Sequence, residues 1–491
     1  MSRSPVLPLS LLIALLIPFL CSVQDADPNL VVETYPDGTV QRRYRVDDSG
    51  QKHGSFEQFF DDGTLEIRTN YSADALDGKY ESFYESGAKR VVAGYSRGLK
   101  NGLWRESAES GDLLLVATYK KDVLHGKYEK HDGAGTRLIA TRYKGGALHG
   151  DHVEFIPELD RTRKCKYKNG QLDGAATVKQ GKKTVSRQKW KAGSLVDLDG
   201  LKPFERNAEE LTKNLATILA DLNGAPALDE GTDDDPQAGG RFAALRRLMA
   251  YRYLCRVNYS DLELVPRWNE LCDAASEVCR MNGGLSHEPD APPGMDDKRY
   301  SEGKQGARNS NLSQSGMVGQ IDAYMDDSDS SNIDRVGHRR WCLNPQLKRT
   351  GFGADGRYSA MWALDRSGKA AKGLDAVLYP PAGWVPVDFF GSDYAWSISV
   401  IKGAVPNADD VEVRIRELDE HWVPAGEPLE LNWKSVQKTD VGSGPCIIFR
   451  PVGLRANAGA RYLAEISTDK GKSFAYRYVV AFCGAVGEAA N

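Results

Sequence analysis

Two histidines next to glycines are the side chains of this chain best suited to chemistry. His287 comes shortly after Gly283-Gly284, and His338 directly follows Gly337. Because glycine lets the backbone turn at little steric cost, we expect both histidines in loops. Imidazole titrates near neutral pH and is a common metal ligand, so the pair is a candidate metal site or acid–base pair. The alternative is that each ring only forms local hydrogen bonds in a turn or a half-buried cleft.

The segments around the two histidines resemble the signature of the CAP superfamily, the SCP-like proteins that include cysteine-rich secretory, antigen-5 and pathogenesis-related proteins. The matching segments are Leu285-Ser286-His287, Asn311-Leu312, Gly337-His338-Arg339 with Asn344-Pro345, and Gly351-Phe352-Gly353. The resemblance implies a central α-β-α sandwich with both histidines in a cleft. It also implies that His287 and His338 are metal ligands, with zinc as the candidate ion.

One position departs from the family signature. Ser310 stands directly before Asn311, where the family has a glutamate. The family cleft pairs two histidines with two acids, and the candidates for the second acid here are Asp326 and Asp327. Since a catalytic zinc ion usually has three protein ligands, the serine weighs against a catalytic metal site.

Three functions are compatible with these residues. The sequence contains no glycine-flanked nucleophilic serine, paired-histidine zinc helix or phosphate loop. The leading hypothesis is therefore a non-enzymatic protein that binds a ligand, a metal or a partner. The alternative is a zinc-dependent hydrolase of envelope polymers or peptides, with His287 and His338 on the metal. An acid would then activate water, and the candidates are Glu302, Asp326 and Asp327. A purely structural envelope scaffold would need neither histidine.

Helical patterns surround the two histidine segments. Apolar residues at helical spacing predict helices that begin near Phe242 and Pro266, and a third over residues 317–325. The second helix has a core stripe that contains Cys272 and Cys279, which we interpret as buried thiols. With strands from Gly351 onward and near residues 361–364, these helices would supply the sandwich that the resemblance implies.

The first residues predict export. An apolar run over residues 6–20, interrupted by Pro8 and Pro18, is typical of a secretory signal peptide rather than a membrane-spanning helix. We expect cleavage between Cys21 and Ala26; lipoprotein anchoring at Cys21 is the less favoured alternative. The protein would be secreted or held at the cell envelope, with a protein, an envelope component or a lipid as partner. A net charge of −4 gives no basic footprint for nucleic acid.

Export also bears on the cysteines, since oxidising compartments favour disulfide bonds. The chain has 8 cysteines, and removal of Cys21 leaves an odd number, so at least one is unpaired. Cys272 and Cys279 lie too far apart along one helix to pair. Cys446 and Cys483 each border an apolar strand near the C-terminus and are the best candidate pair.

A 24-residue repeat occupies residues 30–195. Its glycines are Gly54, Gly78, Gly102, Gly126, Gly150 and Gly174, and a tyrosine stands seven residues before all but the first. Two turn signals per period predict two short strands per repeat and a long antiparallel meander. The array resembles MORN repeats, in the variant found in bacterial proteins described as antitoxin components, which implies an elongated docking surface. We interpret His53, His125 and His149 as turn residues rather than metal ligands.

The prediction divides the chain into five segments. They are a signal peptide (1–26), the repeat array (30–195), a helix with an acidic linker (196–240), the CAP-like domain (241–370) and an extension with an immunoglobulin-like β-sandwich (371–491). Alternation such as that in Val411–Ile415, with several short strands separated by turns, predicts the last of these. The predicted fold class is multidomain α+β: an N-terminal antiparallel β repeat meander, a central α-β-α sandwich and a small C-terminal β-sandwich.

Overall fold

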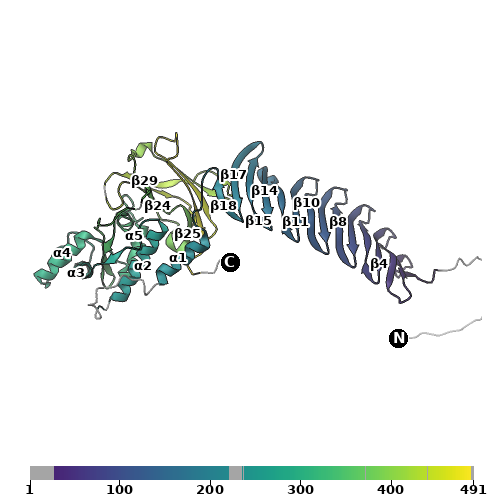
Figure 1. Cartoon of the computed structure of the whole chain (residues 1–491), viewed down its shortest axis with the longest axis horizontal. Coiled ribbons are helices and arrows are strands. Elements are labelled where there is room, and N and C mark those ends of the chain that lie inside the picture. The colour runs from purple at the N-terminus through teal and green to yellow at the C-terminus, as the bar shows by residue number, and fades with distance from the viewer. Residues whose placement is uncertain (1–26, 221–234, 236, 371, 440, 488–491) are drawn as a thin grey trace, which may run out of the picture. The chain divides into compact units, whose positions relative to one another are not determined.

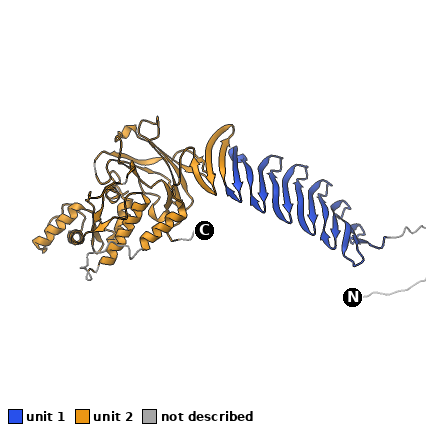
Figure 2. Ribbon diagram, viewed as in Figure 1, with its two compact units in different colours: residues 1–172 blue, residues 173–491 orange. Residues whose placement is uncertain are grey.

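The computed structural model describes residues 27–220, 235, 237–370, 372–439 and 441–487 (Figure 1). The predicted signal peptide and Cys21 lie outside these residues, as does most of the acidic linker. The chain divides into two compact units, residues 1–172 and residues 173–491 (Figure 2). No helix in the described ranges is long and apolar enough to cross a membrane.

Residues 30–198 fold into an antiparallel meander in which each long strand pairs with the next long strand along the chain. Within the described residues this sheet has 18 strands. The strands are β1 (Leu30–Thr34), β2 (Val40–Val46), β3 (Lys52–Phe59), β4 (Leu65–Ser72), β5 (Ala75–Leu76), β6 (Gly78–Phe83), β7 (Lys89–Ser96), β8 (Leu99–Ser107), β9 (Leu113–Lys120), β10 (Val123–His131), β11 (Arg137–Lys144), β12 (Ala147–Leu148), β13 (Gly150–Ile156), β14 (Arg161–Lys168), β15 (Gln171–Leu172), β16 (Gly174–Gln180), β17 (Lys183–Lys191) and β18 (Ser194–Leu198). The repeat glycines adopt a left-handed backbone conformation, as at Gly78 (φ 107°), which explains why glycine recurs there.

A row of cross-strand aromatic pairs follows the repeat. The pairs are Phe56–Tyr71, Tyr80–Tyr95, Trp104–Tyr119 and Tyr128–Tyr143, each edge-on, with ring centroids 5.3 to 6.3 Å apart. Such a pair stabilises neighbouring strands by about 0.5–1.5 kcal/mol beyond the burial of its area. The regular spacing of the aromatic residues therefore stabilises each hairpin against its neighbour.

Helices and short sheets make up most of the second unit. The helices are α1 (Ala208–Ala220), α2 (Ala238–Leu254), α3 (Pro266–Met281), α4 (Asp297–Asn309), α5 (Gly316–Asp326) and α6 (Gly337–Cys342). Strands β20 (Ser310–Ser313), β22 (Phe352–Asp355) and β23 (Tyr358–Trp362) form one sheet in the order β20-β23-β22, and β19 (Glu263–Leu264) pairs with β21 (Arg349–Thr350). A third sheet contains β24 (Ala376–Tyr379), β26 (Trp396–Val400), β30 (Cys446–Pro451) and β29 (Leu431–Gln437). A fourth contains β25 (Gly383–Pro386), β32 (Tyr476–Cys483), β31 (Arg461–Ser467), β27 (Glu412–Leu418) and β28 (Pro424–Ala425).

The predicted fold class, with its central α-β-α sandwich, is wrong. The described part of the protein is mostly β, with 42% of these residues in strands and 19% in helices, and its largest element is the long antiparallel sheet. The buried side chains of α1, α2, α5 and α6 share one hydrophobic cluster with the C-terminal strands. Those of α3 and α4 pack with β20 and β23 in a second cluster.

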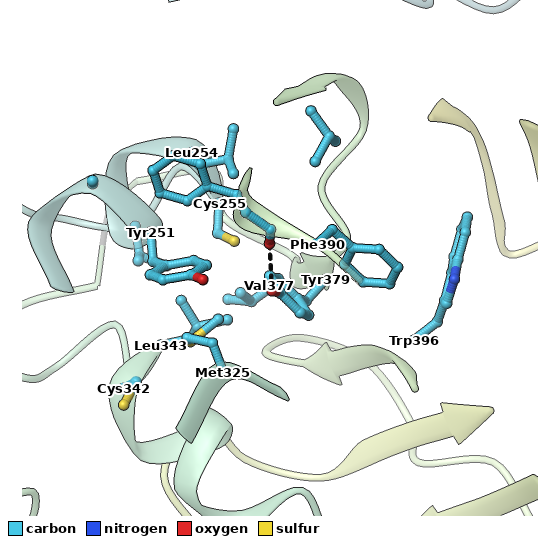
Figure 3. Close-up of a cluster of buried hydrophobic side chains, with 14 of the residues drawn as sticks. Tyr251, Leu254, Cys255, Met325, Cys342, Leu343, Val377, Tyr379, Phe390 and Trp396 are labelled. Atoms are coloured by element: carbon cyan, nitrogen blue, oxygen red, sulfur yellow. Dashed lines mark hydrogen bonds between the residues drawn. The ribbon is translucent and has the colours of Figure 1, made fainter. Parts of the chain in front are cut away.

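Figure 3 shows this shared core at close range. Tyr251 of α2 and Met325 of α5 face Tyr379 of β24, and Trp396 of β26 lies in the same cluster. All four side chains are at most 1% exposed. One hydrophobic cluster therefore joins residues of α2 and α5 to residues of the C-terminal strands.

Glycines allow α3 to pack very closely against its neighbours. A Cβ at Gly306 of α4 would lie 2.0 Å from the carbonyl oxygen of Leu271, and one at Gly353 of β22 would lie 2.2 Å from the backbone nitrogen of Asp273. Between Gly351 and Gly353, the side chain of Phe352 is fully buried. The Gly351-Phe352-Gly353 sequence therefore lets β22 lie directly on α3. This packing positions the chain segments that precede and follow α3 and α4.

The cysteines outside position 21 are all free thiols, including the predicted pair Cys446 and Cys483. Those two residues lie in different sheets, on β30 and β32. The interpretation of Cys272 and Cys279 as buried thiols is confirmed, since they are 0% and 1% exposed. Burial raises the pKa of Cys272 to about 12, which disfavours a reactive thiolate.

Candidate functional site

Three segments that are far apart in the sequence line one cavity of about 590 Å³. We call it the histidine cleft. Its lining residues are Leu285, Ser286, His287, Arg308, Ser310, Asn311, Leu312, Ser331, Asn332, Arg335, Gly337, His338, Trp341, Leu364 and Val441. The structure therefore brings His287, His338 and Ser310 to the same cavity, as a shared site requires.

His287 lies in the loop between α3 and α4. Its Nδ1 is 2.8 Å from the carbonyl oxygen of Ala307, and because a carbonyl can only accept, Nδ1 carries the proton. The loop itself is fixed at two points: Asn282 donates to the carbonyl of Asp290 at 2.9 Å, and the Tyr300 hydroxyl donates to that of Pro289 at 3.1 Å. In the described part of the chain, no protein group bonds to the Nε2 of His287, so this nitrogen is available to a ligand.

His338 is the second residue of α6 and is held more firmly. Its Nδ1 lies 2.8 Å from Oδ1 of Asp327, and its ring stacks on Tyr324 with the centroids 5.5 Å apart. The Asn311 side chain donates to the carbonyl oxygen of His338 at 3.0 Å. These contacts fix both the ring and the backbone of His338, and again leave Nε2 as the ring nitrogen with no protein partner among the described residues.

Buried arginines anchor the helix that carries His338. Arg339 donates to the carbonyl oxygens of Met325 and Ala395, each at 2.7 Å. Arg340 donates to those of Thr439 and Gly444, each at 2.6 Å. Since both side chains are at most 1% exposed, these bonds fix α6 to α5 and to segments next to β26 and β30.

Ser310 differs in chemistry from the glutamate that the family signature has at this position. It is 2% exposed, and its hydroxyl lies 3.5 Å from Sγ of Cys272 in α3. The strand that carries it, β20, pairs with β23 along its whole length, from Ser310 to Ser313. At this position the cleft therefore has a neutral hydroxyl that already has a partner.

The three acids that the sequence nominated to activate water do not line the cleft. Glu302 pairs with Arg267 at 2.8 Å, and that hydrogen bond lowers the pKa of its carboxyl. Burial raises the pKa of Asp326. Asp327, with a side chain that is 1% exposed, lies behind His338 and orients it. Asp327 is thus a positioning residue, a role that sequence spacing did not indicate.

The described residues contain no group of three or more His, Cys, Asp or Glu side chains placed to hold a metal ion. His287 and His338 each have Nδ1 bonded to an oxygen acceptor, which is the usual arrangement of a metal-bound histidine. The other polar groups of the cleft are hydroxyls, amides and guanidinium groups, which are poor ligands for zinc. The side chains of the cleft can therefore bind a ligand through hydrogen bonds. For a metal ion they offer two imidazole ligands.

The histidines of the array have local roles. Nδ1 of His125 accepts a hydrogen bond from the backbone N–H of Gly145 at 3.3 Å, and His131 Nδ1 lies 3.3 Å from the carbonyl oxygen of Gly135. His152, in the register of the aromatic row, meets Tyr167 edge-on at 5.3 Å. Of the histidines interpreted as turn residues, His53 and His125 lie in strands β3 and β10.

Sequence reasoning missed several residues of the cleft, among them Trp341 and Arg335. Trp341 and Arg335 line it, one at each side of His338 in the sequence, but neither belongs to a motif that carries chemistry. Tyr324 was expected only as a core residue of the third helix, and it also supports the His338 ring. The one available signal was proximity: each of these residues lies within 14 positions of His338.

Comparison with protein-family models gave no match, and no curated protein matches the sequence. The case for a function therefore depends on the side chains of the cleft and the array.

Proposed function

We propose that this chain is a non-enzymatic binding protein that acts outside the cytoplasm, holds a small ligand in the histidine cleft, and uses its repeat array as a docking surface. One observation carries the proposal. The segments 285–287, 310–312 and 335–341, which include most of the residues that resemble the CAP signature, line a single cavity of about 590 Å³. A cavity of this size is typical of sites for small molecules.

The shortage of acidic and thiol groups in the cleft supports binding over catalysis. Among the described residues, no aspartate, glutamate or cysteine lines it. The nearest carboxylate to His338 is that of Asp327, which accepts from the His338 ring and from the backbone N–H of Arg339 at 3.2 Å. With both of its oxygens engaged, Asp327 is poorly placed to accept a proton from water.

A zinc-dependent hydrolase is the second candidate, and the matched histidines are the observation that favours it. Both rings have the same nitrogen bonded to an oxygen acceptor and the same nitrogen without a protein partner in the described residues. A zinc ion held by these two rings would still need a further protein ligand and a base, and the cleft supplies neither.

A cavity-filling variant tests the proposal. A Cβ at Gly337 would meet no atom within 4 Å, so Gly337→Phe would occupy the cleft without a clash at its base. The matched control is Gly239→Phe on α2, where the space is also open. Wild type and both variants would be equilibrated with a defined mixture of sugars, sugar acids, amino acids and phosphates and examined by native mass spectrometry. We expect wild type and Gly239→Phe to retain a compound that Gly337→Phe does not; equal retention by all three would contradict the proposal.

A further inference from the structure

We propose that the ligand of the histidine cleft is a small organic anion, a carboxylate or phosphate on a ring-sized body, with Arg335 as its charge partner. This inference deepens the proposed function and rests on it. It comes from the charges that line the cavity, from the pairing of the arginines around it, and from its apolar wall.

The first observation is the charge of the lining. Of the described residues that line the cleft, Arg308 and Arg335 are cationic, two are histidines and none is acidic. Ser310, which is among the lining residues, contributes a neutral hydroxyl. A hydroxyl neither repels an anion nor attracts a metal ion as a carboxylate would.

The second observation is that, among the described residues, only one of the nearby arginine side chains has no hydrogen bond or ion pair. Arg308 forms a two-pronged ion pair with Glu288, with both N–O distances 2.6 Å. Arg339 and Arg340 are buried and bonded to backbone carbonyl oxygens. Within the described residues, the Arg335 guanidinium has no hydrogen bond or ion pair, and it lines the cleft. A planar guanidinium matches carboxylate and phosphate oxygens through paired hydrogen bonds.

Arg335 is also held in place by its backbone. Its N–H donates to the carbonyl oxygen of Asn332 at 2.9 Å, and its own carbonyl accepts from Arg340 at 3.3 Å. Arg340 is itself fixed to the segment around Gly444. The base of the Arg335 side chain is therefore part of a rigid network, which reduces the ordering cost of binding.

The third observation is that large apolar side chains also line the cleft; we call them its apolar wall. The cleft is lined by Trp341 and by Leu285 and Leu364, which are 44% and 42% exposed. Exposed leucines of this kind are normal singly, but here both belong to one cavity. An inorganic anion would leave this wall in water, whereas a ring that carries an anionic group would cover it.

The test uses four hexoses that share a ring and differ in charge. Glucuronate carries a carboxylate, glucose 6-phosphate a phosphate, glucose no charge and glucosamine an ammonium group. Each would be titrated by calorimetry into the full chain from Asp27 onward, as wild type, Arg335→Ala, Arg335→Lys and Lys369→Ala. Lys369 is an exposed cation of the same unit outside the cleft, so its variant controls for net charge.

We expect one or both anions to bind wild type and Lys369→Ala, and glucose and glucosamine to bind far more weakly. Arg335→Ala should weaken anion binding by about 10- to 100-fold, which corresponds to the loss of a charged hydrogen bond. The anion affinity of Arg335→Lys should lie between those of wild type and Arg335→Ala, because lysine keeps the charge but loses the paired hydrogen-bond geometry. The tighter of the two anions identifies the group as carboxylate or phosphate. Because Arg335 is exposed and without side-chain partners, equal melting temperatures would show that its variants fold.

Three results would overturn the inference. One is binding of glucose as tight as that of the anions, another is anion binding unchanged in Arg335→Ala, and the third is no anion binding to wild type. In each case the retention experiment with Gly337→Phe decides separately whether the cleft binds any ligand. A neutral compound or zinc that is lost only in Gly337→Phe would leave the proposed function standing without its anionic ligand.

Discussion

His338 and Asp327 form the best-supported pair of the candidate site. Nδ1 of the imidazole lies 2.8 Å from Oδ1 of a carboxylate that is 1% exposed, and Oδ2 accepts from the backbone N–H of Arg339 at 3.2 Å. Asp327 has a left-handed backbone (φ 46°) at the C-terminal end of α5. A residue other than glycine is uncommon in this conformation, and here it turns the carboxylate toward the start of α6.

Removal of the Asp327 carboxylate should weaken ligand binding without emptying the cleft. In Asp327→Ala the His338 ring loses its orienting acceptor. At metal sites, loss of such a partner costs about 10- to 100-fold in metal affinity or activity, and we expect a loss of ligand affinity here as well. The free energy of unfolding should also fall by about 1–3 kcal/mol, because the buried N–H of Arg339 loses its acceptor. Titration of glucuronate beside chemical denaturation measures both quantities. Asp393→Ala, at an exposed position, is the control, and equal affinity in wild type and Asp327→Ala would show that His338 does not need this support.

Purified protein should contain no stoichiometric zinc. The described lining of the cleft offers two imidazoles and no carboxylate or thiolate, whereas zinc sites in proteins have three or four protein ligands. Elemental analysis of the chain from Asp27 onward, beside a His287→Ala/His338→Ala variant, measures this. Stoichiometric zinc in wild type that disappears in the variant would instead favour the hydrolase.

Arg252→Met should be strongly destabilising. The Arg252 side chain is fully buried in α2 and donates to the carbonyl oxygens of Asn258, Cys342, Asn344 and Leu347 at 2.6 to 3.2 Å. Burial lowers the pKa of this guanidinium to about 10, so it is still charged at neutral pH. Methionine fills similar space but leaves the carbonyls without donors, and we expect a loss of at least about 3 kcal/mol in the free energy of unfolding. Arg246→Met on the same helix should change it by less than about 0.5 kcal/mol. Denaturant unfolding compares the two, and similar losses would contradict a special role for Arg252.

The array should lose stability in acid through its paired glutamates. Hydrogen bonds from Arg43 to Glu57, and from Lys79 and Lys89 to Glu81, lower the pKa of each carboxyl below its ordinary value of 4.5. A lowered folded-state pKa stabilises the protein above pH 4.5, and this contribution is lost as the pH falls through the folded-state value.

A Glu57→Gln/Glu81→Gln variant tests this pH dependence. Solvent screens the partners, whose side chains are 52 to 61% exposed, so we expect a loss of about 0.5–1 kcal/mol for each carboxylate at pH 7. The difference from wild type should shrink toward zero as the pH falls below 4. Denaturant unfolding at a series of pH values measures it, and a constant difference across the series would contradict the account.

The sequence predicted those features that depend on residues close together in the chain. The array glycines recur because a positive φ is needed at fixed steps, and Gly78 and Gly126 show it. Similarly, the helical stripe with Cys272 and Cys279 predicted their burial. The cleft was predictable only as a pair of histidines, since His287 and His338 are 51 residues apart and their meeting depends on how closely Gly306 and Gly353 let α3 pack.

The remaining features depended on tertiary packing. The fold class failed because apolar periodicity identifies helices but not the elements against which they pack, and Tyr251 and Met325 pack against C-terminal strands. The disulfide prediction failed because strand position in the sequence does not give the sheet, and Cys446 and Cys483 lie in different sheets. Asp327 was noticed as an acid, but its role as a support for His338 follows from a left-handed turn that the sequence does not mark.

The most direct test of a shared binding cleft is the NMR spectrum of the histidine rings during a titration with glucuronate. The chain has 8 histidines, of which only His287 and His338 line the cleft. Assignment follows from the two single His→Ala variants. If the cleft is one binding site, the resonances of His287 and His338 will shift together along one binding curve while those of the other histidines stay in place. Shifts of the array histidines alone, or separate curves for His287 and His338, would contradict it.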